Sequence, residues 1–216
     1  MGAAESLPSA SVVVDDATRK ITFYKQERMW DCGIACLRMV YSWANEDYMP
    51  PTNVLNIHSP LWTIDLLGEL LNSKSIVCKM YTQSVGVQPH HKEMAWYTSN
   101  SNNDFTRIQH KFSMNWPVFI EKISLSTILI ALSEGKIAIV LVDSKSLQGQ
   151  NHLQNDYTGH FIVVTGYSDG QIIYLDPSSA DGVECRIFEA DFEMSRSHEG
   201  TDHDIIICSK ADKATP

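Results

Sequence analysis

Apolar side chains recur at helical spacing in several stretches of the first 135 residues, with polar turns between them. Residues 30–44 carry such a pattern, and Asp31 stands where a helix N-cap belongs. Residues 63–71 show a second amphipathic pattern. Proline and asparagine dominate residues 48–60, which predicts a loop. Three further helices are predicted over residues 89–97, 104–114 and 126–133, the last with a serine cap and ending before Gly135.

The C-terminal third has a different pattern, made of short runs rich in β-branched residues. Such runs are typical of sheet strands. They cover residues 137–142, 160–167, 171–175 and 205–208, and similar runs over 20–25, 76–82 and 117–121 predict strands earlier in the chain. A helical first part followed by a strand-rich last part predicts an α+β fold. With no long linker between the halves, we expect a single domain over 19–210, with loose ends at 1–18 and 211–216.

Composition excludes several classes of protein. The chain has 216 residues, 44% of them hydrophobic and 20% charged, which is ordinary for a globular protein. The net charge of −9, with no cluster of Lys and Arg, argues against a nucleic-acid partner. Apolar runs are too short to span a bilayer. Five irregularly spaced cysteines and the lack of a signal peptide predict a reducing, cytoplasmic location.

The N-terminus offers a weak lipidation signal. Its first six residues fit the myristoylation pattern at Gly2. No basic patch follows to supply a second anchor, so a plain flexible start is the preferred interpretation.

The first stretch with chemical potential is Gln26–Cys36. Cys32 falls at the first turn of the predicted helix, where free N–H groups and partial positive charge favour a thiolate. Gly33 would let a substrate or backbone approach closely, and the Gln26 amide could donate to an oxyanion beside the sulfur. A lone cysteine is more often a core residue, but this combination favours Cys32 as a nucleophile. Cys36, one turn along, is predicted to pack in the core.

The second stretch joins two predicted strands through the turn signal at Ser168, Asp169 and Gly170. A two-residue turn would place His160 and Asp176 on opposite faces of the hairpin. A three-residue loop would pair Asp176 with Ile162 and bring its carboxylate onto the face of His160. We therefore expect the three-residue loop, with His160 as general base and Asp176 as the group that orients it. For Asp176 the alternative is a turn former before Pro177.

Other polar residues fit structural roles better than catalytic ones. Asp65 is predicted to make structural hydrogen bonds. Asp202 and Asp204 could hold a metal, but a capped turn after Gly200 is the preferred interpretation. Zinc held by the two cysteines and the histidine of the candidate site would need a fourth ligand that the sequence does not supply. No metal and no cofactor is therefore predicted for a hydrolase.

Two resemblances follow from these motifs. The spread of Gln26, Cys32-Gly33, Gly159-His160 and Asp176-Pro177 resembles papain-like peptidases of the bacteriocin-processing, C39-like type. That resemblance implies a helix carrying the nucleophile packed on a C-terminal antiparallel sheet. It also implies Gln26 as oxyanion donor, Cys32 as nucleophile, His160 as base and Asp176 as orienter.

A closer resemblance covers residues 22–209. The chain is similar to the guanylyl cyclase domain-containing family, which includes the plant guanylyl cyclase 1-like proteins. The motifs that carry it are WDCG at 30–33, LWTIDL at 61–66, AIVLV at 138–142, GHFIV at 159–163 and GTDHDI at 200–205. Residues 144–158 lack the cysteine-rich insertion found in some animal members. That loop is expected to border the site, so substrate preference could differ.

The family name implies conversion of GTP to cyclic GMP with Mg²⁺ or Mn²⁺. The chain has no Walker-type glycine-rich loop for phosphates. The candidate residues instead predict a thiol hydrolase acting on a peptide or isopeptide bond in a peptide or protein substrate. The guanylyl cyclase remains the alternative, as does a non-catalytic binding module on the peptidase fold.

Overall fold

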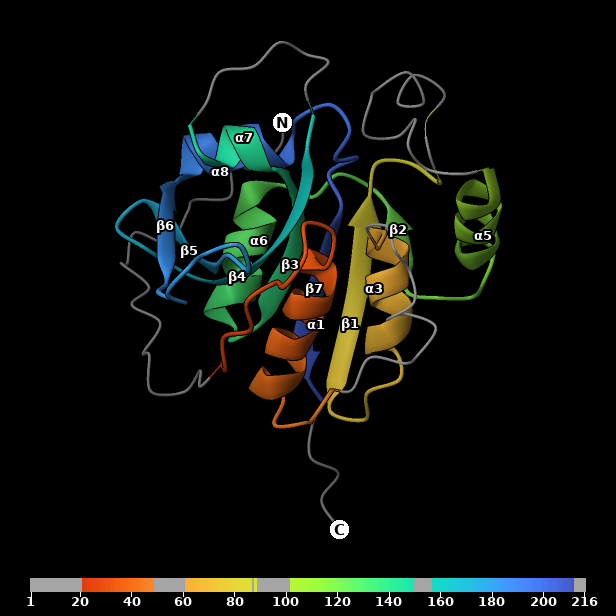
Figure 1. Ribbon diagram of the computed structural model, residues 1–216, viewed down its shortest axis with the longest axis horizontal. Coiled ribbons are helices and arrows are strands. Elements are labelled where there is room, and N and C mark those ends of the chain that lie inside the picture. Colours follow the sequence, from red (N-terminus) through yellow and green to blue (C-terminus); the bar gives the residue numbers. More distant parts are fainter. Residues whose placement is uncertain (1–20, 49–60, 87, 89–101, 150–156, 212–216) are drawn as a thin grey trace, which may run out of the picture.

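A seven-stranded mixed sheet, packed with helices on both faces, forms the framework of the protein (Figure 1). The computed structural model describes residues 21–48, 61–86, 88, 102–149 and 157–211. The helices are α1 (Cys32–Trp43), α3 (Thr63–Leu70), α5 (Asn102–Phe112), α6 (Leu125–Ser133), α7 (Ser144–Leu147) and α8 (Glu189–Arg196). The strands are β1 (Ile76–Thr82), β2 (Val118–Ile120), β3 (Ile137–Asp143), β4 (Gly159–Ser168), β5 (Gln171–Leu175), β6 (Cys185–Phe188) and β7 (Ile205–Lys210).

The strand order is β2-β1-β7-β3-β4-β5-β6. Neighbouring strands are antiparallel except β1 and β2, which are parallel. The predicted α+β class is confirmed. The sheet is not confined to the C-terminal third, however, because β1 and β2 come from the first 120 residues and extend it beyond β7.

Two hydrophobic cores lie on opposite faces of the sheet. Residues of β3 and β4 alternate between them: Ile139 and Phe161 belong to the core with α1 and α3, whereas Val140 and Ile162 belong to the core with α6 and α8. Strand β3 is therefore buried along its whole length, which explains its unbroken apolar sequence. No helix in the described ranges is long and apolar enough to cross a membrane.

Most predicted elements are confirmed to within two residues at each end. The predicted strand over 20–25 is wrong, because residues 21–25 are irregular and lie along α1, where the Thr22 N–H donates to Ser42 Oγ at 3.0 Å. The helix predicted over 89–97 and all of the loop predicted over 48–60 except Tyr48 lie outside the described residues.

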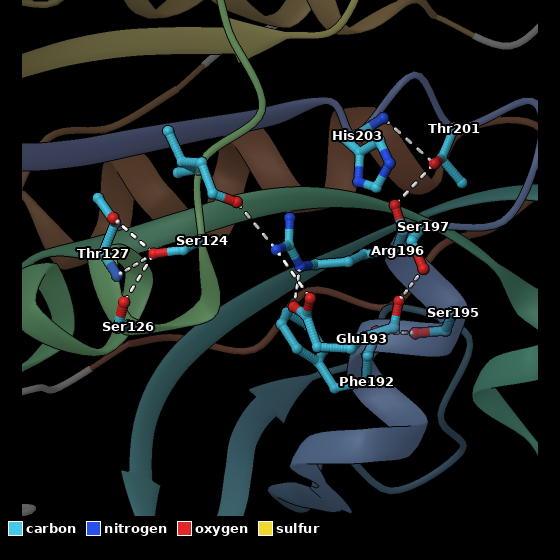
Figure 2. Close-up of polar contacts among 11 residues, drawn as sticks. Ser124, Ser126, Thr127, Phe192, Glu193, Ser195, Arg196, Ser197, Thr201 and His203 are labelled. Carbon is cyan, nitrogen blue, oxygen red and sulfur yellow. Dashed lines mark hydrogen bonds and ion pairs between the residues drawn. The ribbon is translucent and has the colours of Figure 1, made fainter. Parts of the chain in front are cut away.

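Helix α8 had no prediction, because polar contacts hold it in place more than an apolar stripe does. Phe192 is its one fully buried large apolar residue, and Arg196 is equally buried. Arg196 Nη2 donates to the carbonyl oxygen of Ile123 at 3.0 Å, and the guanidinium pairs with Glu193 (Figure 2). The Thr201 hydroxyl donates to the Arg196 carbonyl oxygen at 2.7 Å, which ties the turn after the helix to its last residue. Strand β6 and the single-turn α7 were missed for the same lack of apolar periodicity.

We expect Gly200→Ala to destabilise the fold more than Gly135→Ala. Both glycines have a left-handed φ, of +101° and +81°, so both variants meet backbone strain. At Gly200 a Cβ atom would also lie 2.9 Å from the Tyr157 ring, whereas at Gly135 it would meet open space. Overpacking of this kind costs about 1–3 kcal/mol beyond the backbone term. Urea unfolding of the two variants measures the difference, and equal losses of stability would contradict it.

Candidate active site

Cys32 is the first residue of α1 and is 5% exposed. The first N–H groups of a helix have no carbonyl partner within it, so Cys32 stands at the positive end of the helix dipole. Close packing holds this helix tip against its neighbours. A Cβ atom on Gly33 would lie 3.0 Å from Leu66 and 3.5 Å from Phe161. A side chain here would therefore need Leu66 to shift by a few tenths of an ångström, so Gly33 favours close contact with α3 and β4, a packing role that sequence analysis had not identified.

Asp31 organises the loop before the helix rather than capping the helix itself. It occupies the predicted N-cap position, but its side chain makes no capping hydrogen bond. Its carboxylate instead accepts the backbone N–H groups of Glu27 at 3.2 Å and Arg28 at 3.1 Å. Asp31 thus shapes the turn that carries Gln26, a role the sequence analysis missed. The tendency of aspartate to bind nearby backbone donors was the available signal.

The hairpin of β4 and β5 brings His160 and Asp176 together by a route that differs from the prediction. Ser168 pairs with Gln171, so the turn has two residues, Asp169 and Gly170, both with positive φ. The predicted three-residue loop is wrong. The register instead shifts at a β-bulge between Val164 and Gly166, after which Val163 pairs with Leu175.

The bulge produces the alignment that a longer loop would have given. One residue beyond the Val163–Leu175 pair, the register sets Ile162 opposite Asp176, as expected. His160 Nε2 and Asp176 Oδ1 lie 2.8 Å apart. The same carboxylate oxygen accepts the Ser178 N–H at 2.8 Å and the Ser178 hydroxyl at 2.7 Å. Asp176 is therefore held from two sides.

The electrostatics of this pair favour a charged imidazole. Burial lowers the pKa of His160, but hydrogen bonds to Asp176 and Cys32, together with their charges, raise it to about 10. Burial likewise opposes ionisation of Asp176, yet its bonds with His160 and Ser178 lower its pKa. Because Nε2 is bonded to the carboxylate, Nδ1 is the ring nitrogen left for the sulfur. The structure thus brings Cys32, His160 and Asp176 into one interacting set.

Gln26 reaches the same region through its backbone. Its N–H donates to the Pro177 carbonyl oxygen at 2.9 Å, which anchors the segment next to Asp176. Its side-chain Nε2 donates to the Arg28 carbonyl oxygen at 2.9 Å. The side-chain oxygen is buried and has no hydrogen-bond partner within the described residues. The amide that was predicted to bind an oxyanion is therefore turned toward its own loop.

The remaining candidates occupy structural positions. Cys36 is fully buried, as predicted, and burial with the nearby charges of Cys32 and Asp176 raises the pKa of its thiol. Asp65 accepts the Trp62 N–H at 3.0 Å and pairs with Arg107 and Lys111 of α5, which confirms its structural role.

The predicted turn after Gly200 is also observed. The Asp204 N–H donates to the Thr201 carbonyl oxygen at 2.9 Å, and Asp202 and His203 both have positive φ. Over the described ranges, no three His, Cys, Asp or Glu side chains are grouped so as to hold a metal ion.

Comparison with known proteins assigns the chain to a family. Residues 21–208 match the family model described as guanylylate cyclase, and the chain belongs to this family. The predicted family resemblance is thereby confirmed. Guanylyl cyclase 1 of Arabidopsis thaliana is 28% identical over 197 residues, which cover 82% of this chain and 71% of that protein. Among solved structures, a putative C39-like peptidase from Bacillus anthracis matches with a TM-score of 0.47 and 15% identity, covering 90% of this chain and 96% of that one.

We predict that the pKa of His160 falls when either partner is removed. In the Cys32→Ala and Asp176→Asn variants, one hydrogen bond and one charge that favour the imidazolium are lost, while burial still disfavours it. An NMR titration of the imidazole resonances measures the shift, with His160→Gln to assign the signal. The buried His203, whose pKa is lowered to about 4 by burial and by the nearby Lys122 and Arg196, serves as the internal control. An unchanged His160 titration in both variants would show that the three groups do not interact.

Proposed function

We propose that the protein is a thiol hydrolase that cleaves a peptide or isopeptide bond, with Cys32 as nucleophile. One observation carries the proposal: the His160 ring bonds Asp176 at 2.8 Å and interacts with the Cys32 sulfur at a helix tip. A nucleophile, a base and a group orienting the base are the three parts that thiol catalysis needs.

The first half of the reaction uses the charged form of His160. Cys32 as thiolate attacks the carbonyl carbon of the scissile bond, and its electron pair forms the new carbon–sulfur bond while the carbonyl oxygen becomes an oxyanion. When the intermediate collapses, the carbon–nitrogen bond breaks and His160 gives its proton to the departing amine. The raised pKa of His160 supports this step, because the ring enters the reaction already protonated.

The second half returns the enzyme to its starting state. His160, now neutral, takes a proton from a water molecule, which attacks the thioester carbon. The carbon–sulfur bond then breaks, the acid product leaves and Cys32 again faces an imidazolium. Asp176 keeps the ring oriented throughout, since its carboxylate is held by Ser178 as well as by His160.

Donors for the oxyanion come from two sources in this proposal. The first source is the backbone N–H groups at the start of α1, the helix that begins at Cys32. The Gln26 amide supplies the second donor, which requires its Nε2 to turn from the Arg28 carbonyl toward the substrate. The backbone bond to Pro177 holds Gln26 close to the site in either position.

Alkylation by iodoacetamide tests the activation of Cys32. The test compares two of the five thiols. Cys185 is partly exposed, whereas Cys32 is buried. If exposure alone governed reactivity, Cys185 would be modified first. We expect mass spectrometry of the native protein to find Cys32 modified first, with its rate lowered at least tenfold in His160→Gln. Modification of Cys185 ahead of Cys32, or no effect of His160→Gln, would refute the assignment.

The second candidate function is cyclisation of GTP to cyclic GMP. It is favoured by the description of the family model and by the name of the Arabidopsis relative. A cysteine thiol has no part in that chemistry. A cyclase therefore predicts cyclic GMP from GTP with Mg²⁺ or Mn²⁺ at a rate that Cys32→Ser leaves unchanged. The thiol hydrolase predicts that Cys32→Ser abolishes cleavage of a fluorogenic peptide library and that the purified chain forms no cyclic GMP.

A further inference from the structure

The chain turns sharply directly after β5. The Ser179 N–H donates to the Asp176 carbonyl oxygen at 2.9 Å, which closes a β-turn over residues 176–179. Within this turn the Ser178 N–H donates to the Asp176 carboxylate at 2.8 Å, the contact of an Asx turn. Pro177 at the second position fixes the backbone angle that such a turn needs. Asp176 is therefore the turn former that the sequence allowed as an alternative, and it contacts His160 at the same time.

A single oxygen of Asp176, Oδ1, accepts all three donors around the carboxylate. His160 Nε2 lies 2.8 Å from it, the Ser178 backbone nitrogen 2.8 Å and the Ser178 hydroxyl 2.7 Å. The turn fixes the backbone N–H, and the sheet fixes the imidazole, whereas a hydroxyl can rotate about its C–O bond. The Ser178 hydroxyl is therefore the donor that can adjust when the charge of the ring changes.

The negative charge of Asp176 has few supports, because the side chain is only 16% exposed and burial opposes its ionisation. Within the described residues, its ion-pair partner is His160. The thiols of Cys36 and Cys185 lie close enough for the Asp176 charge to raise their pKa values, and as neutral groups they add no positive charge. The carboxylate is therefore stabilised by one imidazolium and by the two donors of Ser178.

The proposed reaction removes the imidazolium from this balance halfway through. Once Cys32 has become a thioester, its sulfur carries no negative charge, and one of the contributions that raise the pKa of His160 is lost. The ring must then be neutral to take a proton from water. A neutral ring offers Asp176 an N–H but no positive charge, while burial still opposes the carboxylate. The donors of Ser178 therefore matter most in the second half of the reaction.

We propose that Ser178 is a positioning residue of this site, whose hydroxyl keeps the Asp176 carboxylate ionised and directed at His160 while the thioester is hydrolysed. Its effect is exerted through Asp176. When the attacking water gives a proton to the ring, the carboxylate that Ser178 holds stabilises the imidazolium that forms. The inference rests on the proposed function, because it assigns a role within that reaction, but the hydrogen bond itself can be measured separately.

Three substitutions isolate the hydroxyl from the rest of the turn. The Ser178 side chain is exposed, so its replacement leaves the two cores intact. Threonine keeps the hydroxyl, whereas valine has nearly the same shape without it, so Ser178→Thr and Ser178→Val form a matched pair. Ser179→Ala is the control for the same loop, because the Ser179 hydroxyl donates to Asp181 at 2.8 Å rather than to Asp176.

Acetylation by p-nitrophenyl acetate separates the two halves of the reaction. The Cys32 thiolate attacks the acetyl carbon, the carbon–sulfur bond forms, and the ester carbon–oxygen bond breaks. The p-nitrophenolate leaves with the electron pair and needs no proton from His160. Water then attacks the thioester, His160 takes its proton, and acetate leaves as the carbon–sulfur bond breaks. The initial burst of p-nitrophenolate therefore measures the first half, and the steady rate that follows measures the second.

We expect Ser178→Val to lower the steady rate about tenfold, the size expected for one hydrogen bond to a charged group, and to change the burst rate by no more than about twofold. Ser178→Thr should retain most of the steady rate, and Ser179→Ala should leave both phases unchanged. A purely structural role for Ser178 predicts similar losses in both phases. Such losses, or equal steady rates in Ser178→Val and Ser178→Thr, would overturn the proposal.

A second measurement follows the carboxylate without any reaction. Carbon-13 NMR of labelled aspartate, with Asp176→Asn to assign the signal, reports the pKa of Asp176. In a Cys32→Ala background, which removes the sulfur charge as the thioester does, this pKa should be higher with Ser178→Val than with Ser178→Thr, because the hydroxyl bond that lowers it is lost. Equal values in the two variants would show that the hydroxyl does not stabilise the carboxylate.

The two measurements also separate this inference from the proposed function. If the unmodified protein shows no burst that Cys32→Ala removes, the hydrolase falls, and the role of Ser178 in it falls too, even where the Asp176 pKa responds. If that burst is present but Ser178→Val changes neither the steady rate nor the Asp176 pKa, the hydrolase stands and the positioning role falls.

Discussion

Close packing of the α1 tip at Gly33 is the contact on which the arrangement of the site depends. A Cβ atom there would stand 3.0 Å from the end of the Leu66 side chain and 3.5 Å from the Phe161 ring, so the helix tip packs tightly against α3 and β4. Helix α1 carries its thiol on the preceding residue, and β4 carries its imidazole on the residue before Phe161. Close packing at this point therefore helps to hold the helix that carries the thiol against the strand that carries the imidazole.

A second constraint acts within the sheet. The two-residue turn at Asp169 and Gly170 suits the twist of a hairpin, but by itself it would leave the carboxylate of Asp176 out of register with His160. The bulge before Gly166 adds the one residue that corrects this. The turn thus closes one end of the β4–β5 hairpin, and the bulge aligns Asp176 with His160 at the other end. Bulges commonly re-aim a side chain next to a functional site in this way.

The sequence was sufficient for most of the fold and for the residues of the site, but not for their geometry. Apolar periodicity located α1 and four of the five strands of the C-terminal third, because each buries a regular face. It could not find α8, which is held by the buried Arg196, or the bulge, which depends on pairing between strands. The choice of Cys32, His160 and Asp176 followed from their local contexts. The packing role of Gly33 could not be inferred in this way, since it rests on a contact with α3 that a linear pattern does not contain.

Several groups that cost free energy lie at the end of the sheet that carries the site. Burial opposes the charge that Asp176 and Cys32 favour on His160, Gln26 has an oxygen without a partner among the described residues, and two successive residues of the 202–203 turn are left-handed. None of these features is needed to close the two cores, which pack on continuous apolar faces of the sheet. Strained or incompletely paired groups of this kind are typical of functional sites, where the surrounding structure holds them in place. Their position at one end of the sheet, near the tip of α1, therefore agrees with the site proposed for the hydrolase.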